Sequence, residues 1–297
     1  MKPGGNILNK RTLTPYLLIA PTFILFTVFF LIPLLYSFTL TFVEWNGFSV
    51  DRVFVGFDNY LRLFEDEDFL NALKNTFVYT ICTVPLSVFL SLIMSSLLND
   101  KVKGFQILKG IYFLPHIVSL VAVGVVWSWI FLPDKYGLLN SILSVFGIEI
   151  QTWLNDPDLA MPSLIIIGIW KSMGYNIVIF IAGLLAIPKS LYEAATIDGA
   201  RNHQTFWYVT LPMLKPTIFF VMVSSTIYSL FQIFDIVNVT TNGGPIGRTE
   251  MLVTYLYKVG FVDYEMGYAS AIAFVLFSLA VIITIIQRKF VEEKEDA

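Results

Sequence analysis

Charge is what this sequence has least of. Of its 297 residues, 14% are charged and 56% are hydrophobic, whereas a soluble domain carries roughly 25% charged residues. The mean hydropathy is +0.73. Because a soluble protein of this length needs a polar surface that this composition does not supply, the sequence predicts a protein embedded in lipid. The net charge of −3 gives no indication of the excess of basic residues that nucleic-acid binding needs.

Cysteine and histidine are almost missing. The one cysteine, Cys82, lies in an apolar run, which excludes an internal disulfide and a cysteine metal cluster. Neither of the two histidines, His116 and His203, has the neighbouring ligands that a zinc site needs, so we expect no metal. We interpret His116 as a structural residue. The first apolar run is too long for the core of a cleavable signal peptide.

The motifs of common enzymes are absent as well. The sequence contains no G-x-S-x-G, no H-E-x-x-H and no pair of aspartates inside two apolar segments. Gly243–Thr249 only approaches a phosphate-binding loop, because its glycine spacing is wrong and Arg248 stands where lysine is required. We therefore expect no catalytic residues and no cofactor bound by this chain. If ATP drives this protein, another chain binds the ATP and its magnesium ion.

Long apolar runs are what the sequence does contain. A helix needs about 20 mostly apolar residues to cross a bilayer, and helices satisfy their own backbone hydrogen bonds in lipid. The predicted fold class is an all-α membrane protein with six transmembrane helices: Thr14–Leu40, Leu73–Leu98, Gln106–Leu132, Met161–Ile187, Pro216–Thr240 and Met266–Gln287.

Lysine and arginine between the runs predict the orientation. The richer set of segments has twelve and the other set has five, so the richer set is predicted to be cytoplasmic, together with both termini. The twelve are Lys2, Lys10, Arg11, Lys101, Lys103, Lys109, Lys189, Arg201, Lys215, Arg288, Lys289 and Lys294. The five are Arg52, Arg62, Lys135, Arg248 and Lys258.

The chain divides into three predicted regions. Residues 1–70 hold the tail, the first helix and the first outer loop; residues 71–288 hold a five-helix core; residues 289–297 form a cytoplasmic tail. Within the core, loop 188–215 is polar, and Leu191 to Ile197 has the periodicity of a short helix, which we expect Pro212 to stop. Thr241–Pro245 predicts a turn or re-entrant segment.

Two predicted spans carry polar residues along one face. In the fourth, Lys171 and Tyr175 are spaced i, i+4, beside a strip of Ser172 and Asn176. In the fifth, Tyr228, Gln232 and Asp235 share a face, with Ser225 and Ser229 close by. A lysine this deep is costly against lipid, so the faces predict a polar pathway. The alternatives are structural pairing of Lys171 and polar contacts between helices. Aromatic rings and amides on one face suit a sugar, which has an apolar ring face and many hydroxyls.

Loop 188–215 also carries a specific motif. Glu193-Ala194-Ala195, Gly199, Val209 and Leu211-Pro212 match the pattern E-A-A-x3-G-x9-I-x-L-P, with valine in place of isoleucine. This resembles the EAA motif of the inner-membrane permeases of binding-protein-dependent ABC importers. The resemblance covers about residues 12–290 and is strongest to the carbohydrate branch, at Tyr60–Phe64, Ala72–Thr76, Pro115, Trp127, Gly174–Asn176, Phe231–Asp235 and Thr241–Pro245.

The resemblance implies a type I ABC importer permease, working in the cytoplasmic membrane of a prokaryote. The implied partners are a second permease subunit, an ABC ATPase dimer and an extracytoplasmic solute-binding protein. Loop 188–215 would form a coupling helix that docks on the ATPase through Glu193, Ala194, Ala195, Asp198, Gly199, Leu211 and Pro212. The implied carbohydrate contacts are Lys171, Ser172, Tyr175, Tyr228, Ser229, Gln232 and Asp235.

Three alternatives stay open at this point. In the first alternative the transported solute is glycerol-3-phosphate. Binding an anion would need more basic side chains in the pathway than Lys171 alone. An ion-coupled secondary transporter would need midplane carboxylates or a repeated architecture, which the sequence does not display. A membrane enzyme lacks its catalytic residues.

Overall fold

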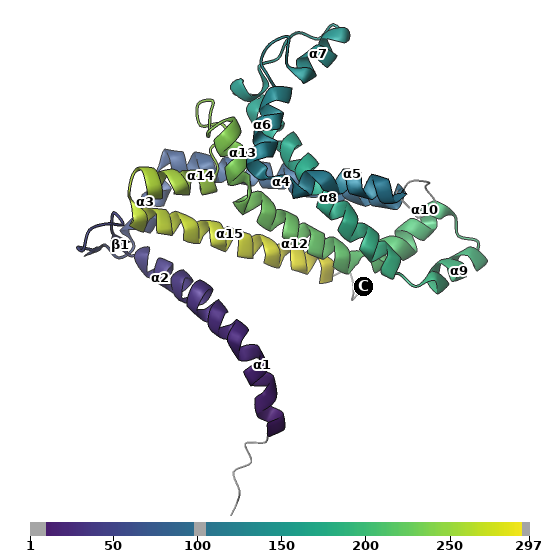
Figure 1. Ribbon diagram of the computed structural model, residues 1–297, viewed down its shortest axis with the longest axis horizontal. Helices are drawn as coiled ribbons and strands as arrows, with labels where there is room; N and C mark the ends of the chain where they lie inside the picture. Colours follow the sequence, from purple (N-terminus) through teal and green to yellow (C-terminus); the bar gives the residue numbers. More distant parts are fainter. Residues whose placement is uncertain (1–9, 98–104, 293–297) are drawn as a thin grey trace, which may run out of the picture.

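The computed structural model describes residues 10–97 and 105–292, and helices dominate it (Figure 1). In chain order the elements are α1 (Lys10–Phe26), η1 (Thr27–Leu31), α2 (Ile32–Leu40), β1 (Val43–Glu44), β2 (Val53–Phe54), α3 (Asp58–Glu65), α4 (Glu67–Leu97), α5 (Phe105–Ile117), α6 (Leu120–Ile130), α7 (Leu138–Val145), η2 (Trp153–Asn155), α8 (Ala160–Ala186), α9 (Lys189–Ile197), α10 (Asn202–Thr205), η3 (Phe206–Thr210), α11 (Leu211–Met213), α12 (Lys215–Phe231), α13 (Ile233–Thr240), α14 (Leu252–Tyr257), η4 (Lys258–Val262) and α15 (Met266–Glu292).

Five of the six predicted membrane spans are confirmed in type and place. Among the described residues, five helical segments are long and apolar enough to cross a bilayer: Pro15–Leu40, Glu67–Leu97, Ala160–Ala186, Lys215–Thr240 and Met266–Lys289. A sixth crossing is counted if the pair of helices over Gly110–Ile117 and Leu120–Ile130 is one span. The chain is therefore an all-α, multi-pass membrane protein.

One predicted span, Gln106–Leu132, is wrong as a continuous helix. The helix ends before Val118 and Ser119, and the axes of α5 and α6 differ in direction by 107°. Ser119 has an extended backbone, with ψ 141°. Pro115 precedes the break and has no N–H to close the last turn of α5, which weakens the helix there. An apolar run predicts that a segment enters lipid, but it does not report a bend inside the segment.

Helix α8 lies at the centre of the fold and packs against α4, α5 and α12. Two of its glycines allow this close packing. A Cβ at Gly168 would overlap the hydroxyl of Tyr79 on α4, and one at Gly174 would overlap the carbonyl oxygen of Tyr112 on α5. Small residues let helix backbones approach in lipid, where dispersion contacts and hydrogen bonds replace the hydrophobic effect.

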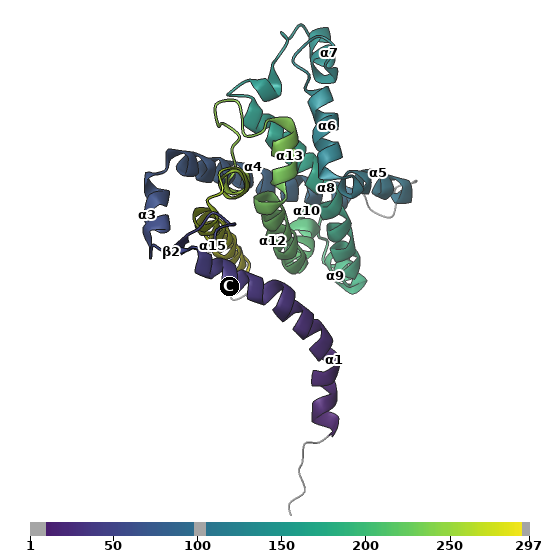
Figure 2. The ribbon, with the colours of Figure 1, turned by 60° about the vertical axis from the view of Figure 1, so that its left-hand side comes forward.

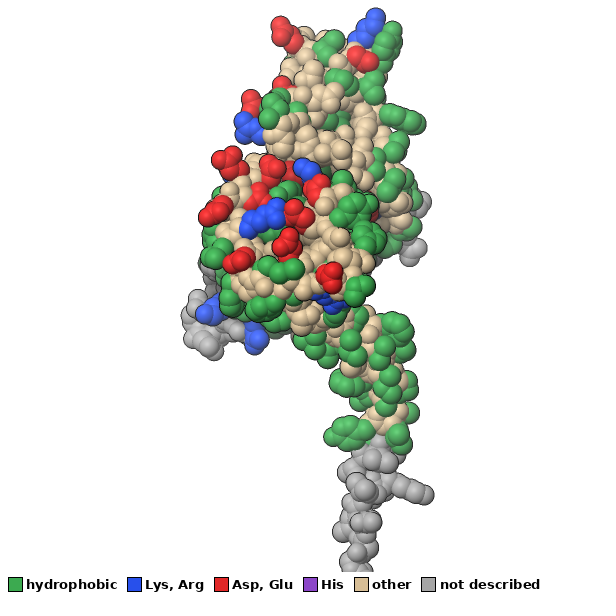
Figure 3. Space-filling model, turned by 90° about the vertical axis from the view of Figure 1, so that its left-hand side faces the viewer, with side chains coloured by type: hydrophobic (Ala, Val, Ile, Leu, Met, Phe, Trp, Pro, Cys, Tyr) green, Lys and Arg blue, Asp and Glu red, His purple; other side chains and the backbone are tan. Residues whose placement is uncertain are grey.

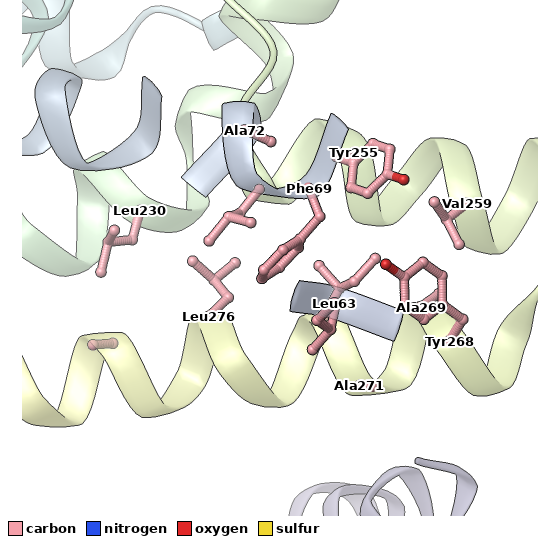
Figure 4. Close-up of a cluster of buried hydrophobic side chains, with 13 residues drawn as sticks. Leu63, Phe69, Ala72, Leu230, Tyr255, Val259, Tyr268, Ala269, Ala271 and Leu276 are labelled. Carbon is pink, nitrogen blue, oxygen red and sulfur yellow. The ribbon is translucent and has the colours of Figure 1, made fainter. Parts of the chain in front are cut away.

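A second packing centre joins α3, α4, α12, α14 and α15, and Figure 4 shows its side chains converging. Phe69 of α4 is 4% exposed and lies among Leu63, Tyr255 and Leu276. Asp66, just before α4, accepts hydrogen bonds from the hydroxyls of Tyr255 and Tyr268, both at 2.6 Å. These contacts tie the start of α4 to α14 and α15.

The first span, α1 to α2, departs from the rest of the molecule as an arm (Figures 1 and 2). None of its most apolar window is buried against the chain. Charged side chains gather instead on the face around α3 and the β1–β2 hairpin, whereas the arm shows apolar side chains (Figure 3). We call this face the α3 end and the opposite end, which carries α9, the α9 end.

Candidate functional site

A cavity of about 330 Å³ opens between α5, α8 and α12. Its volume lies at the low end of the range of small-molecule sites, about 300–1,000 Å³. The lining residues come from the end of α5, the middle of α8, the second half of α12 and the residue that follows α12: His116, Ser172, Tyr175, Asn176, Ser224, Ser225, Ile227, Tyr228 and Gln232.

The cavity lies beside the break between α5 and α6 and beside a one-residue irregularity in the span Lys215–Thr240. His116 is next to the last residue of α5, directly before the break to α6. Gln232 stands between α12 and α13. The ring of His116 stacks on Tyr175 with centroids 4.8 Å apart, so an aromatic pair forms one wall. Interrupted helices within a membrane are tolerated where they are buried in protein or line a polar cavity, which is the arrangement here.

The lining offers neutral hydrogen-bonding groups. Asn176 of α8 and Ser225 of α12 bond to each other across the cavity, with Nδ2 to Oγ at 3.1 Å. The hydroxyl of Tyr228 is buried without a hydrogen-bond partner in the described parts of the chain. It therefore has a hydrogen bond to offer to a bound molecule. Apart from His116, no lining side chain can carry a charge at neutral pH.

The structure brings together four of the seven predicted pathway residues: Ser172, Tyr175, Tyr228 and Gln232. The other three are not in the cavity lining. The amine of Lys171 is bonded to backbone carbonyls at the end of α5. Ser229 is 2% exposed and its hydroxyl lies 3.3 Å from that of Thr80 on α4, while Asp235 lies in the first turn of α13.

Five lining residues were not among the seven predicted pathway residues: His116, Asn176, Ser224, Ser225 and Ile227. Of these, Asn176 and Ser225 lie on the two predicted polar faces. Ser224 is spaced i, i+4 from Tyr228, so helical spacing could have placed it on the same face of α12 as Tyr228. His116 follows Pro115, and a proline inside an apolar run is a signal for a break at which the next side chain turns inward. The interpretation of His116 as purely structural is thus incomplete, since its ring also lines the cavity.

The predicted short helix in loop 188–215 is confirmed as α9, none of whose residues is buried. Glu193 is exposed, as are Ala194 and Asp198, whereas Ala195 is half-buried. Gly199 has φ +75° and closes the helix. The N–H groups of Gly199 and Ala200 donate to the carbonyls of Thr196 and Ala195, a hydrogen-bond pattern that glycine in this conformation favours at helix ends.

The expectation that Pro212 stops this helix is wrong. The stop is at Gly199, and Pro212 lies in the first turn of α11 together with Leu211. The backbone of Thr210 and Leu211 is helical, so η3 continues into α11 and Pro212 lies inside this helical stretch. The hydroxyls of Tyr192 and Thr210, 3.2 Å apart, join α9 to η3. The motif residues thus form two connected parts, an exposed helix and the helical lead into α12.

Residues 67–294 match the family described as the binding-protein-dependent transport system inner membrane component. The chain belongs to this family. It is a permease subunit of a binding-protein-dependent importer and a non-catalytic translocation subunit. The matched region contains both the cavity and α9.

Similar proteins match this chain over nearly its whole length. The sn-glycerol-3-phosphate transport system permease protein UgpA of Agrobacterium fabrum is 36% identical and is aligned over 97% of this chain and 98% of its own length. The crystal structure of a bacterial ABC transporter involved in the import of the acidic polysaccharide alginate matches with a TM-score of 0.78, 26% identity and 96% coverage of both chains. A structure of the bacterial alginate ABC transporter in complex with an alginate pentasaccharide-bound periplasmic protein matches with a TM-score of 0.77, 26% identity, and 94% and 93% coverage.

Proposed function

We propose that this permease forms half of the pathway for an uncharged carbohydrate. The observation that carries the proposal is the cavity beside the break between α5 and α6, lined by hydroxyls, amides and aromatic rings. A sugar has hydroxyls for Gln232, Asn176 and Tyr228, and an apolar ring face for the aromatic wall of Tyr175 and His116. The proposed solute contacts are the four predicted residues in the lining together with His116, Asn176, Ser224 and Ser225. Lys171, Ser229 and Asp235 are left out.

The energy comes, in this proposal, from ATP bound with magnesium on a separate ATPase dimer in the cytoplasm. The exposed helix α9 docks on that ATPase through Glu193, and the small side chains of Ala194 and Ala195 allow close contact. Gly199 ends α9, and the hydrogen bond between Tyr192 and Thr210 joins α9 to η3, so that movement of α9 reaches α12 through Leu211 and Pro212. In the described residues Glu193 makes no hydrogen bond or ion pair that would compete with docking.

The remaining partners follow from the same assignment. A second permease completes the pathway, and an extracytoplasmic solute-binding protein delivers the carbohydrate at the α3 end. The protein lies in the cytoplasmic membrane of a prokaryote with both termini in the cytoplasm. The alginate importer complex supports the delivery step, because it holds a periplasmic protein loaded with a saccharide.

A second candidate solute is an anion such as glycerol-3-phosphate, for which the relative UgpA is named. A buried anion needs a cationic partner. His116 in the lining would supply one when protonated. The amine of Lys171 is held by carbonyls instead, which favours the uncharged solute.

The test is uptake by cells that contain the complete importer, compared with cells lacking this chain. The probes are radiolabelled maltose, sucrose and raffinose, and sn-glycerol-3-phosphate. We expect uptake of at least one saccharide, and a fall on the order of tenfold in the double variant Tyr175→Ala, Gln232→Ala, which loses a ring contact and an amide hydrogen bond. Cys82→Ala, on an exposed position of α4, is the control and should transport normally. Uptake of glycerol-3-phosphate without any saccharide would replace the carbohydrate assignment with the second candidate.

A further inference from the structure

Lys171 is a buried lysine whose charge has no carboxylate partner in the described residues. It lies within α8 and is 2% exposed. Its amine is within hydrogen-bond distance of three carbonyl oxygens: Pro115 at 2.6 Å, His116 at 3.1 Å and Val118 at 2.5 Å. All three belong to the end of α5 and the break that follows it.

The chemistry of the two groups is matched. The last carbonyls of a helix have no partner within the helix, and in a membrane an unpaired carbonyl is costly. A lysine amine carries three N–H donors, one for each of these oxygens. Its positive charge also lies at the end of α5 where the helix dipole is negative. The amine thus supplies both the hydrogen bonds and the charge that an interrupted helix end requires.

This contact sets one wall of the cavity. His116, whose carbonyl accepts one of the three bonds, stacks its ring on Tyr175, one helical turn beyond Lys171. Gly174, between them, lets the backbone of α5 approach α8 directly. The position of the His116 ring therefore depends on where Lys171 holds the end of α5.

We propose that Lys171 is a positioning residue that holds the break between α5 and α6 in place and so fixes the His116 wall of the cavity, without contacting the solute. The inference rests on the proposed function, since it assigns that wall to the solute pathway. It also explains how a charged group lies next to a cavity for an uncharged solute. The lysine charge is taken up by backbone oxygens.

The test uses a cysteine reporter in the full-length protein within its importer, in membranes. Replacing the native cysteine (Cys82→Ala) and introducing His116→Cys places one thiol on the wall. The rate of its reaction with N-ethylmaleimide is then measured without any solute. Lys171→Met keeps the length of the side chain but removes every donor, and we expect the labelling rate to change by about tenfold or more, as expected for the loss of hydrogen bonds to a charged group. Lys171→Arg keeps the charge and N–H donors, and its labelling rate should stay closer to that of the parent than the rate of Lys171→Met does. Lys74→Met, at an exposed position on α4, is the matched control.

Uptake of the transported probe is measured in the same lysine variants without the reporter, per amount of protein in the membrane. For Lys171→Met we expect a lower maximal rate together with a changed half-saturation concentration, which a loss of protein alone would not produce. Unchanged labelling and unchanged uptake constants in Lys171→Met would overturn the proposal.

Failure to accumulate is also informative. If Lys171→Met does not accumulate, Lys171→Gln replaces it. Loss of both with accumulation of Lys171→Arg supports the positioning role, whereas loss of all three contradicts it. Because labelling needs no solute, an altered rate without saccharide uptake would overturn the carbohydrate assignment and leave the role of Lys171 standing.

Discussion

At the scale of single residues, long side chains with polar ends link parts of the chain that are far apart in sequence. The amine of Lys171 donates hydrogen bonds at the end of α5, and the carboxylate of Asp66 accepts hydrogen bonds from the hydroxyls of Tyr255 and Tyr268. The sequence placed Lys171 at depth and identified it as costly, but its partners are backbone oxygens, which every residue has. A contact of this kind leaves no pattern in the sequence. Tyr175 and Gln232 were predicted because helical spacing alone brings them to polar faces.

Asp66 leads to a pH-dependent prediction. Partial burial raises the pKa of its carboxyl, but hydrogen bonds from Tyr255, Tyr268 and the N–H groups of Phe69 and Asp68 outweigh this and hold the pKa below its usual value. A carboxyl with a lowered folded-state pKa stabilises the fold above the unfolded-state pKa, and the contribution disappears as pH falls through the folded-state pKa. We expect the apparent melting temperature in detergent to be constant near neutral pH and to fall below about pH 4.

Asp66→Asn should remove part of this acid sensitivity and lower stability at pH 7 by about 1 kcal/mol, after allowance for solvent screening. Glu65→Gln, at the exposed neighbouring acid, is the control and should melt as the parent does. The measurement is thermal unfolding of the purified protein from pH 8 to pH 3. Identical profiles for Asp66→Asn and the parent would contradict the role of Asp66.

At the scale of elements, the apolar spans could be predicted from the sequence, whereas bends and helix ends could not. The spans follow from runs of about 20 apolar residues, because lipid demands them. The break at Val118 lies inside such a run, where hydrophobicity stays high through the bend. In the polar loop, the periodicity from Leu191 to Ile197 predicted α9 correctly, but its stop was misassigned. Gly199, with positive φ, ended the helix, whereas Pro212 lies inside the helical stretch formed by η3 and α11.

Gly199 supplies the prediction at this scale. No atom outside its neighbours lies within 4 Å of a Cβ added there, so a substitution meets backbone strain rather than a clash. Gly199→Val should misdirect the end of α9, at a cost of about 1–2 kcal/mol for a side chain in the left-handed region. Gly199→Asn fits that region much better and is the matched control. We expect several-fold lower uptake per protein for the valine variant than for the asparagine variant. Equal uptake would show that the ending of α9 is unimportant for transport.

At the scale of the whole molecule, the chain resembles one part of an assembly. The arm from α1 to α2 exposes apolar side chains. Exposed apolar helix surface suits lipid or a second membrane subunit. Exposed helix α9, with Glu193 unpaired in the described residues, suits a partner at the opposite end from α3. These surfaces agree with the family, whose members are components of larger transport systems.

The most direct test of the central claim is co-purification. The tagged chain is purified in mild detergent from cells containing the complete importer, and the proteins that accompany it are identified. We predict a second permease and an ATPase, with the ATPase lost in Glu193→Lys while the second permease remains. Glu149→Lys, an exposed acid away from α9, should retain both. Recovery of the chain alone, from membranes that still accumulate the solute without ATP, would contradict the assignment of α9 as the contact through which ATP drives transport.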